Sequence, residues 1–210
     1  MIRIMIADDH AIVRQGLARI LERTGDMSVV AEHDNGVDAL NWLRSNDCDI
    51  ALIDISMPGM SGIDLLKQIR EEKPKLPVLV VSIYSEDQYA VRLIRAGASG
   101  YLTKGSAPAI VVESVRQVVS GRKYISPAVA EMLAGEIGDP GGKLPHETLS
   151  DREYQIFLLL ASAKTVTEIA DMLALSGKTV STYRSRILEK MNLRNNAEIM
   201  HYAIEKQLSM

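Results

Sequence analysis

The sequence predicts an α/β domain with a five-stranded, doubly wound parallel sheet, followed by a small all-α domain of four helices. Short apolar runs alternate with segments of helical periodicity across residues 1–120, which is typical of a parallel sheet with helices on both faces. Glycine and proline accumulate across residues 121–148, which indicates a linker. Residues 149–210 show only helical periodicity, so we expect them to form the second domain.

The first domain is expected to contain five strands that alternate with five helices. The strands are short runs rich in Ile, Val, Leu and Ala, as expected for strands that are buried on both faces. These runs are Ile2–Ala7, Ser28–Ala31, Ile50–Ile53, Val78–Ile83 and Tyr101–Thr103. The helical patterns include Ile12, Leu17, Ile20 and Leu21, then Ile63, Leu66 and Ile69, then Val91, Leu93 and Ile94.

Helix-start signals mark the linker and the second domain. Ser126 and Pro127, followed by residues 128–134, predict a short linker helix with a serine cap and proline in its first position. Ser150, with Glu153 three residues later, predicts a capping box at the first helix of the second domain.

Composition excludes secreted, membrane-spanning and disulfide-stabilised classes of protein. The 210 residues are 47% hydrophobic and 24% charged, which is ordinary for a globular protein. No segment approaches the roughly 18 apolar residues that a membrane helix needs, and Ile4–Ala7 is too short for a signal peptide. The single cysteine, Cys48, excludes an internal disulfide. We therefore expect a cytoplasmic protein that does not associate with membranes.

Five polar side chains follow the strands of the predicted sheet. Asp8 and Asp9 come after the first strand, Asp54 after the third, Ser82 near the end of the fourth, and Lys104 after the fifth. Ligands of open parallel sheets bind at the carboxyl ends of the strands, so these groups should converge. Two carboxylates about 4 Å apart repel by roughly 4 kcal/mol at an effective dielectric of 20. Such a cluster favours Mg²⁺, with one carboxylate left to act as a nucleophile toward phosphate.

These residues, together with Met57-Pro58-Gly59 and Gly100–Lys104, resemble the receiver domain of two-component response regulators, which has a flavodoxin-like fold. The resemblance spans residues 1–120 and implies the role of each residue. It makes Asp54 the phosphoacceptor, and it makes Asp8, Asp9, Asp54 and the backbone carbonyl of Ser56 the Mg²⁺ ligands. It further makes Ser82 and Tyr101 a switch pair, with Lys104 as a phosphate ligand.

The third helix of the second domain has the pattern of a DNA-reading helix. Ser176 is its expected cap, and the helix spans about Lys178–Met191. At 100° per residue, one face is apolar and the opposite face carries small polar groups. The apolar residues are Val180, Tyr183, Ile187, Leu188 and Met191, and the polar ones are Lys178, Ser181, Thr182, Ser185 and Glu189. Small polar side chains flanked by cations suit a major groove. The alternative is the solvated face of an ordinary bundle helix.

Residues 149–210 resemble the helix-turn-helix of the NarL/FixJ (LuxR-type) family. The resemblance rests on Leu149–Glu153, Glu168–Ala170, Ser176–Val180 and Lys190-Met191, and Lys178–Tyr183 is most similar to the BvgA/EvgA branch. One departure is Ala163, where the family has glycine. The expected DNA contacts are Thr165, Lys178, Thr179, Ser181, Thr182, Arg184, Ser185, Arg186 and Lys190. The final helix is similar to the family's dimerisation helix, which implies dimer contacts through Ile199, Met200 and Ala203. The alternative is that it packs against the other three helices, and both can hold.

Both resemblances together imply a response regulator. A sensor histidine kinase would phosphorylate Asp54, and phosphorylation would control dimerisation and binding to promoter DNA with inverted half-sites. Two alternatives stay open. One is a DNA-binding transcription factor that acts without phosphorylation and has a degenerate receiver. The other is an aspartyl-phosphate phosphatase, although Ser56 stands where such an enzyme would carry a second aspartate.

Overall fold

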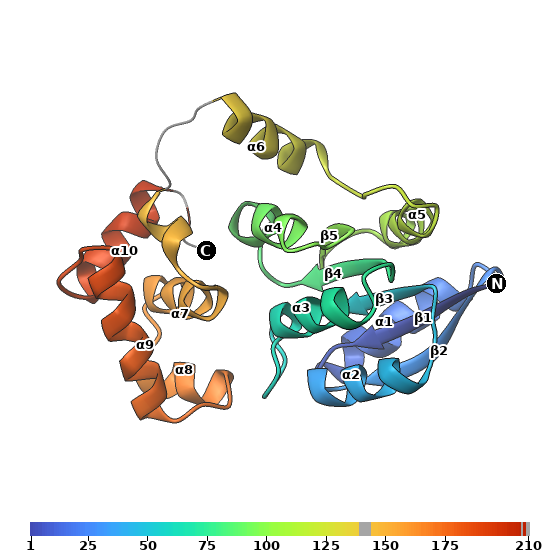
Figure 1. Ribbon diagram of the computed structural model, residues 1–210, viewed down its shortest axis with the longest axis horizontal. Helices are drawn as coiled ribbons and strands as arrows, with labels where there is room; N and C mark the ends of the chain where they lie inside the picture. The colour runs from blue at the N-terminus through green and yellow to red at the C-terminus, as the bar shows by residue number, and fades with distance from the viewer. Residues whose placement is uncertain (139–143, 207, 209–210) are drawn as a thin grey trace. The chain divides into compact units, whose positions relative to one another are not determined.

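The computed structural model describes residues 1–138, 144–206 and 208. The chain forms two compact units, Met1–Glu136 and Ile137–Met210, and Figure 1 shows the elements of each. None of the helices in the described residues has both the length and the apolar character to cross a bilayer.

The first unit contains the predicted five-stranded parallel sheet, in the order β2-β1-β3-β4-β5. Its strands are β1 (Ile2–Ala7), β2 (Met27–His33), β3 (Ile50–Ile53), β4 (Val78–Ser82) and β5 (Gly100–Thr103). The helices between and after them are α1 (Ala11–Glu22), α2 (Gly36–Ser45), α3 (Gly62–Glu72), α4 (Glu86–Arg95) and α5 (Pro108–Val119). Because β1, β3 and β4 lie inside the sheet, the loops after them are held close together at its carboxyl edge.

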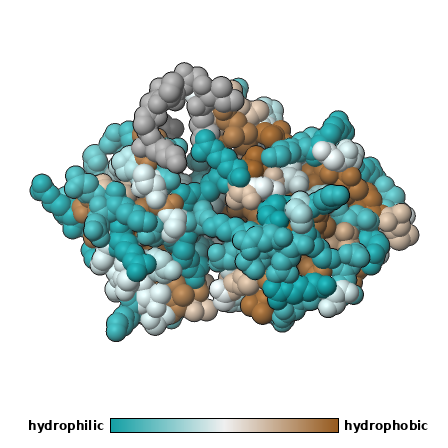
Figure 2. Space-filling model, viewed as in Figure 1, coloured by the Kyte–Doolittle hydropathy of each residue, from teal (hydrophilic) through white to brown (hydrophobic). Residues whose placement is uncertain are grey.

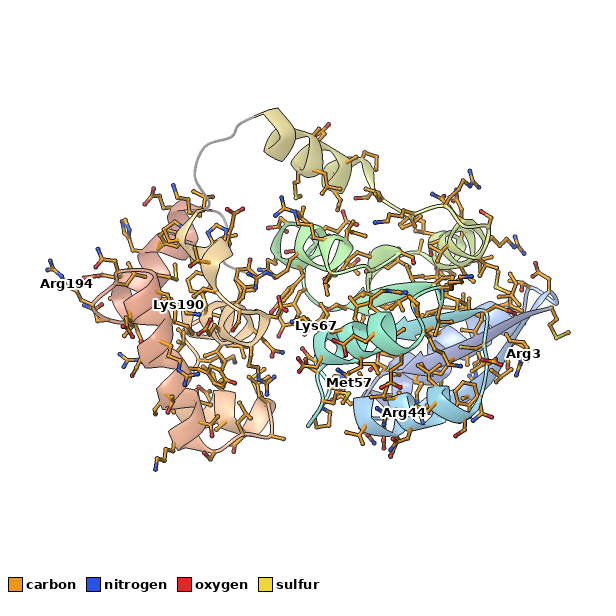
Figure 3. All side chains as sticks on the ribbon, in the orientation of Figure 1. Arg3, Arg44, Met57, Lys67, Lys190 and Arg194 are labelled. Carbon is orange, nitrogen blue, oxygen red and sulfur yellow. The ribbon has the colours of Figure 1, made fainter. Side chains whose placement is uncertain are left out.

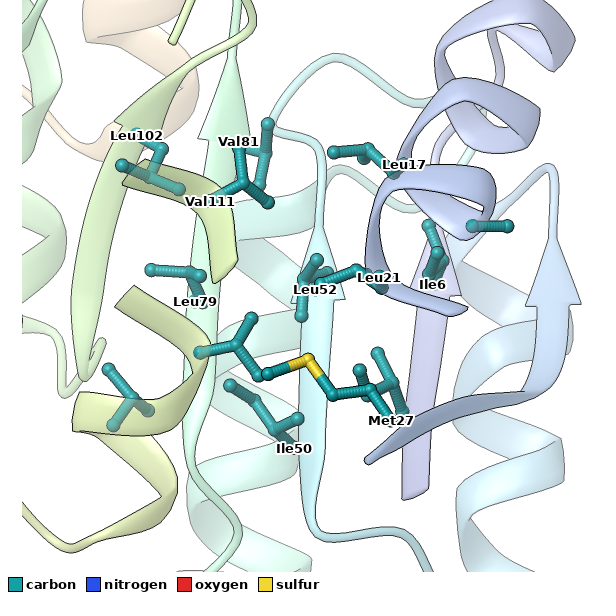
Figure 4. Packing of buried hydrophobic residues seen from close by; sticks show 14 residues of the cluster. Ile6, Leu17, Leu21, Met27, Ile50, Leu52, Leu79, Val81, Leu102 and Val111 are labelled. Atoms are coloured by element: carbon teal, nitrogen blue, oxygen red, sulfur yellow. The ribbon is translucent and has the colours of Figure 1, made fainter. Parts of the chain in front are cut away.

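One core layer lies between the sheet and the helices α1 and α5. In Figure 4, Leu17 and Leu21 of α1 and Val111 of α5 lie with Ile6, Leu52 and Leu79 of the sheet. All six side chains are at most 7% exposed. Each such side chain contributes about 1.5–3 kcal/mol when it is fully buried, so this layer fixes the strands that carry the polar cluster.

Ile12 does not belong to the apolar face of α1, as its pattern predicted, because it is 87% exposed. It lies nine residues before the buried Leu21, which corresponds to roughly half a turn around the helix axis. Trp42 is half-buried and lies beside the ring of His33.

The linker helix α6 spans Pro127–Gly138 and extends beyond residue 134, where the predicted helix ended. Ser126 caps it as predicted, because its Oγ accepts a hydrogen bond from Val129 N at 3.3 Å. The glycine-rich stretch 139–143, predicted to be flexible, lies outside the described residues.

The second unit is helical, as predicted. It contains a short 3-10 helix, η1 (Pro145–Thr148), followed by α7 (Asp151–Ala161), α8 (Val166–Met172), α9 (Gly177–Lys190) and α10 (Asn196–Glu205). Helix α7 packs against α8, α9 and α10. Ser150 and Glu153 form the predicted capping box, and Ser176 caps α9. Ala163 has a positive φ of 60°, the conformation that glycine adopts more readily.

On the face of the molecule shown in Figure 2, hydrophilic residues predominate and apolar residues form small groups among them.

Candidate functional site

Asp8, Asp54 and Lys104 meet at the carboxyl edge of the sheet. Asp54 N donates to the carbonyl of Ala7 at 2.8 Å, which ties the end of β3 to the end of β1. Lys104 Nζ lies 2.8 Å from Asp8 Oδ2 and 2.9 Å from Asp54 Oδ2. All three groups are buried: Asp8 is 1% and Asp54 2% exposed, and the Lys104 side chain is 8% exposed.

The electrostatics of this trio depend on a single cation. Burial raises the pKa of Asp54, and the neighbouring Asp8 charge adds to that rise, while Lys104 opposes it. Burial disfavours the charged form of Lys104, but the two carboxylates outweigh it and raise the pKa of this ammonium. Two buried carboxylates thus share one lysine, which leaves a site with unbalanced negative charge.

The cluster has the donors of a metal site. One ligand atom from each of Asp8, Asp9, His10 and Asp54 lies within 4.8 Å of the others. Oδ1 of Asp54 is buried and accepts no hydrogen bond from the part of the chain that the structure describes. An unpaired buried carboxylate oxygen is costly, and a hard cation prefers such oxygen ligands. These carboxylates therefore fit a divalent cation.

His10 contacts both of the carboxylates that precede it in the sequence. It occupies the N-cap position of α1, and its Nδ1 lies 2.6 Å from Asp9 Oδ1. Its backbone N–H donates to Asp8 Oδ1 at 2.8 Å. His10 thus orients both neighbouring carboxylates, and its position next to Asp9 in the sequence could have suggested this.

Ser82 and Tyr101 lie on neighbouring strands beside this cluster, and both are buried. The Tyr101 hydroxyl donates to the carbonyl of Tyr84 at 2.8 Å, and Tyr84 N–H donates to Ser82 Oγ at 3.3 Å. Burial raises the pKa of Tyr101, although a hydrogen bond with Ser82 opposes the rise. The predicted switch pair is therefore joined through Tyr84.

Tyr84 is a site residue that the sequence interpretation missed. Its side chain is 3% exposed, and its phenol oxygen accepts a hydrogen bond of 3.4 Å from Ser56 Oγ. Burial raises the pKa of this phenol, and the charge on Asp54 adds to the effect. Its place two residues after Ser82 is the only signal that the sequence offers.

The exposed face of α9 carries the residues predicted to read DNA. Val180 and Ile187 are buried, while the polar residues opposite them are exposed. The exposed residues are Lys178, Ser181, Thr182, Ser185 and Arg186. Thr182 and Ser185 donate their hydroxyl protons to carbonyls one turn earlier in α9, so their oxygens still present lone pairs outward.

Two threonines of the predicted DNA contacts occupy helix starts. Thr165 is the exposed N-cap of α8. Thr179 is half-buried, and its Oγ1 lies 2.8 Å from the capping Ser176 Oγ. Both side chains therefore already make hydrogen bonds at the start of a helix.

The cations of α9 differ in their surroundings. Lys190 Nζ pairs with Glu153 Oε2 at 2.7 Å, and Glu153 is 3% exposed. Arg184 Nε donates to Asn196 Oδ1 at 2.6 Å. Among the described residues Arg186 has no ion-pair partner, and Arg194 extends outward from the domain near Lys190 in Figure 3. Lys190 and Arg184 therefore join helices within the domain, a role that the sequence interpretation did not include.

The dimer contacts expected on α10 need correction. Ile199 and Ala203 are 0% exposed, since α10 packs on α7, so these two residues stabilise the domain interior. Met200 is half-buried, and Ile204 is 65% exposed. Periodicity identified the apolar face of α10 but could not show what covers it.

Comparison with known proteins finds a family match in each of the two units. The chain matches the description "Response regulator receiver domain" over residues 4–116 and "Bacterial regulatory proteins, luxR family" over residues 147–203. It is 38% identical to the response regulator UvrY of Escherichia coli over 209 residues, covering 99% of this chain and 96% of UvrY. It is 39% identical to the response regulator GacA of Pseudomonas aeruginosa over 205 residues, covering 97% and 96%.

A solved structure of a response regulator is also similar to this chain over nearly its whole length. RcsB from Salmonella enterica serovar Typhimurium, bound to the promoter rprA in the presence of phosphomimetic BeF3−, is similar with a TM-score of 0.65 and 26% identity. The match covers 96% of this chain and 97% of the RcsB chain. These matches cover both units of the structure. The chain therefore belongs to the NarL/FixJ family of two-component response regulators, which are DNA-binding transcription regulators and not enzymes.

Proposed function

We propose that a sensor histidine kinase phosphorylates Asp54 and that the phosphoryl group controls dimerisation and sequence-specific DNA binding. The single observation that carries this proposal is the buried Asp54 carboxylate, which pairs with Lys104 through Oδ2 and leaves Oδ1 without a hydrogen bond. A free carboxylate oxygen next to a cation has the arrangement of a nucleophile for phosphoryl transfer.

The chemistry of the cluster supports Mg²⁺ as the cofactor. Asp8, Asp9 and Asp54, with the backbone carbonyl of Ser56, would hold it. When bound, Mg²⁺ neutralises charge on the transferring phosphoryl group. One oxygen of the Asp54 carboxylate would form the new bond to phosphorus, while the bond from phosphorus to the donor nitrogen breaks and the nitrogen leaves with the electron pair. Lys104 and the Ser82 hydroxyl then hold phosphoryl oxygens through charge-assisted hydrogen bonds.

Helix α9 is the proposed reading element for DNA. Lys178, Ser181, Thr182 and Ser185 are exposed on one face, so we assign them to base edges. The DNA phosphates would be held mainly by Arg186, together with Thr165 and Thr179. Arg184 and Lys190 would also contact phosphates, although each already has a partner within the domain. Two copies related by a two-fold axis would require inverted half-sites about one DNA turn apart. The solved complex of RcsB with a promoter supports DNA as the partner.

Two further assignments belong to the proposal. We retain the division into a receiver (1–120), a linker (121–148) and a DNA-binding domain (149–210). A DNA-binding regulator acts where the chromosome is, so we place the protein in the cytoplasm. The two alternatives are less well supported, because a phosphatase leaves the luxR-family match unexplained and a degenerate receiver leaves the clustered acidic groups unexplained.

Uptake of a phosphoryl group tests the proposal. Acetyl phosphate with Mg²⁺ should add one hydroxylamine-labile phosphoryl group, detected by the mass of the intact chain. Asp54→Asn should abolish this uptake, while Asp34→Asn, an exposed aspartate after β2, should leave it unchanged. Full uptake by Asp54→Asn would refute the assignment of the phosphoacceptor.

A further inference from the structure

The chain beyond α5 remains attached to the sheet before α6 begins. Tyr124 N–H donates to the carbonyl of Ser99 at 2.9 Å, and Tyr124 forms a parallel bridge with Gly100 of β5. A Cβ on Gly100 would lie 2.9 Å from the carbonyl oxygen of Tyr124, so glycine is needed for this approach. The path of the linker is thus fixed against β5 just before α6.

The hydroxyl of Ser126 joins two helices. It donates a hydrogen bond to Glu86 Oε2 in the first turn of α4, and it accepts one from Val129 N in the first turn of α6. Ser126 and Glu86 are both half-buried. Because the acceptor is a carboxylate, this hydrogen bond belongs to the stronger, charge-assisted class.

Glu86 lies only four residues after Ser82, and the intervening loop is held against the Asp54 site. Tyr84 in this loop bonds Ser82 through its N–H and Tyr101 through its carbonyl, as described above. Its buried phenol bonds Ser56. With three attachments and so short a loop, a shift of Tyr84 must move Glu86 as well.

We propose that the Glu86–Ser126 hydrogen bond is a latch that transmits the state of Asp54 to the linker helix α6. This proposal rests on the proposed function, because it needs a phosphoryl group on Asp54. To donate its proton to that group the Ser82 side chain must turn, and because its Oγ accepts the hydrogen bond from Tyr84 N–H, this turn displaces the loop. Hydrogen bonds weaken steeply with distance and angle, so a displacement of about 1 Å opens the latch and releases the first turn of α6.

Amide hydrogen exchange of the full chain tests the latch. The amides of Val129 and Ala130 bond to Ser126 and report the first turn of α6. Wild-type protein should exchange these amides about threefold to tenfold faster with beryllofluoride and Mg²⁺ than without, the factor that corresponds to one hydrogen bond. Glu86→Ala keeps the Ser126 cap but removes the acceptor, so its exchange without beryllofluoride should already equal the activated rate.

A matched control separates the latch from general loss of charge on α4. Asp87→Ala removes the neighbouring, exposed acidic residue of the same helix turn and should behave like wild type. The latch is refuted if Glu86→Ala exchanges Val129 and Ala130 at the wild-type basal rate, or if beryllofluoride still accelerates exchange in that variant. Uptake of a phosphoryl group from acetyl phosphate, measured by mass on the same protein preparations without beryllofluoride, distinguishes a failed latch from a failed phosphoacceptor assignment.

Discussion

Lys104 is the residue on which the receiver site depends most. It is the shared partner of Asp8 and Asp54, both of which are buried. Replacement of such a partner leaves uncompensated buried charge, which is more destabilising than the loss of an exposed ion pair. Lys104 thus balances only part of the negative charge of the two buried carboxylates.

Asp54→Asn should stabilise the metal-free chain at neutral pH. Burial raises the pKa of Asp54 in the folded state, so between about pH 4 and the folded pKa the folded chain binds more protons than the unfolded chain. The contribution of Asp54 to stability therefore falls as pH rises from about 4. Urea unfolding without Mg²⁺ should show a higher free energy of unfolding for Asp54→Asn at pH 7, with the difference shrinking toward pH 4.

Saturating Mg²⁺ should reverse this order, because binding to the folded state stabilises wild type by mass action. A lower free energy of unfolding for metal-free Asp54→Asn at pH 7 would show that the Lys104 ion pair outweighs the burial of the charge. Asp34→Asn, which is exposed, should match wild type within about 0.5 kcal/mol.

Residues at strand ends were predictable from the sequence, and residues that act through tertiary contacts were not. Asp8, Asp54 and Lys104 follow apolar runs, and the geometry of a parallel sheet brings them together. Tyr84 has no comparable signal, since its importance comes from hydrogen bonds to Ser82, Ser56 and Tyr101. Ile199 was expected at a dimer contact from the family resemblance, but it is buried inside the domain, which agrees with the alternative that this helix packs on its neighbours.

At the level of secondary-structure elements, the caps and strands were the most predictable features. Strands β1 and β3 have the predicted bounds, and Ser126, Ser150 and Ser176 cap helices as expected. Helix α6 runs past Gly135, although glycine disfavours a helix interior by roughly 1 kcal/mol. Local sequence signals therefore predicted where helices start better than where they end.

Two cations of α9 should respond differently to mutation. Lys190→Gln leaves the buried Glu153 without its ammonium partner, so it should lower the free energy of unfolding of the second domain by about 1–3 kcal/mol. Arg186→Gln should change that free energy by less than about 0.5 kcal/mol. It should instead reduce the slope of log affinity for DNA against log salt by roughly one. Denaturant melts and salt titrations measure the two effects, and a reversed pattern would contradict the assigned roles.

Ala163→Gly should stabilise the second domain. Ala163 has a φ of 60° and is exposed, so glycine relieves a strain of roughly 1–2 kcal/mol without leaving a cavity. Part of the gain is offset by the entropy that glycine adds to the unfolded chain, which leaves a net gain of up to about 1 kcal/mol.

Ala174→Gly, at a φ of 50°, should show the same sign in thermal unfolding. Ala197→Gly lies inside the first turn of α10 and is also exposed, so it should destabilise the domain. Destabilisation by all three substitutions would mean that the positive φ values carry no strain.

The chain combines a receiver domain with a luxR-family DNA-binding domain. A coupling of about 1–3 kcal/mol between the two functions would change DNA affinity about 5- to 150-fold. The proposed latch gives one route by which a change at Asp54 would reach the linker helix α6: from Tyr84 through Glu86 to Ser126. Sequence patterns identified both domains but not this contact, because a serine cap and an acidic first turn are ordinary features of separate helices.

The central claim is that phosphorylation of Asp54 controls binding of DNA by a dimer. Sedimentation and DNA-binding measurements on the full chain, with and without acetyl phosphate and Mg²⁺, test it most directly. The account predicts that phosphodonor shifts wild type toward a dimer and tightens its binding to a site with two inverted half-sites by at least about fivefold. Asp54→Asn should show neither change. Equal monomer fractions and equal DNA affinities for wild type with and without phosphodonor, at full phosphoryl uptake, would contradict the account.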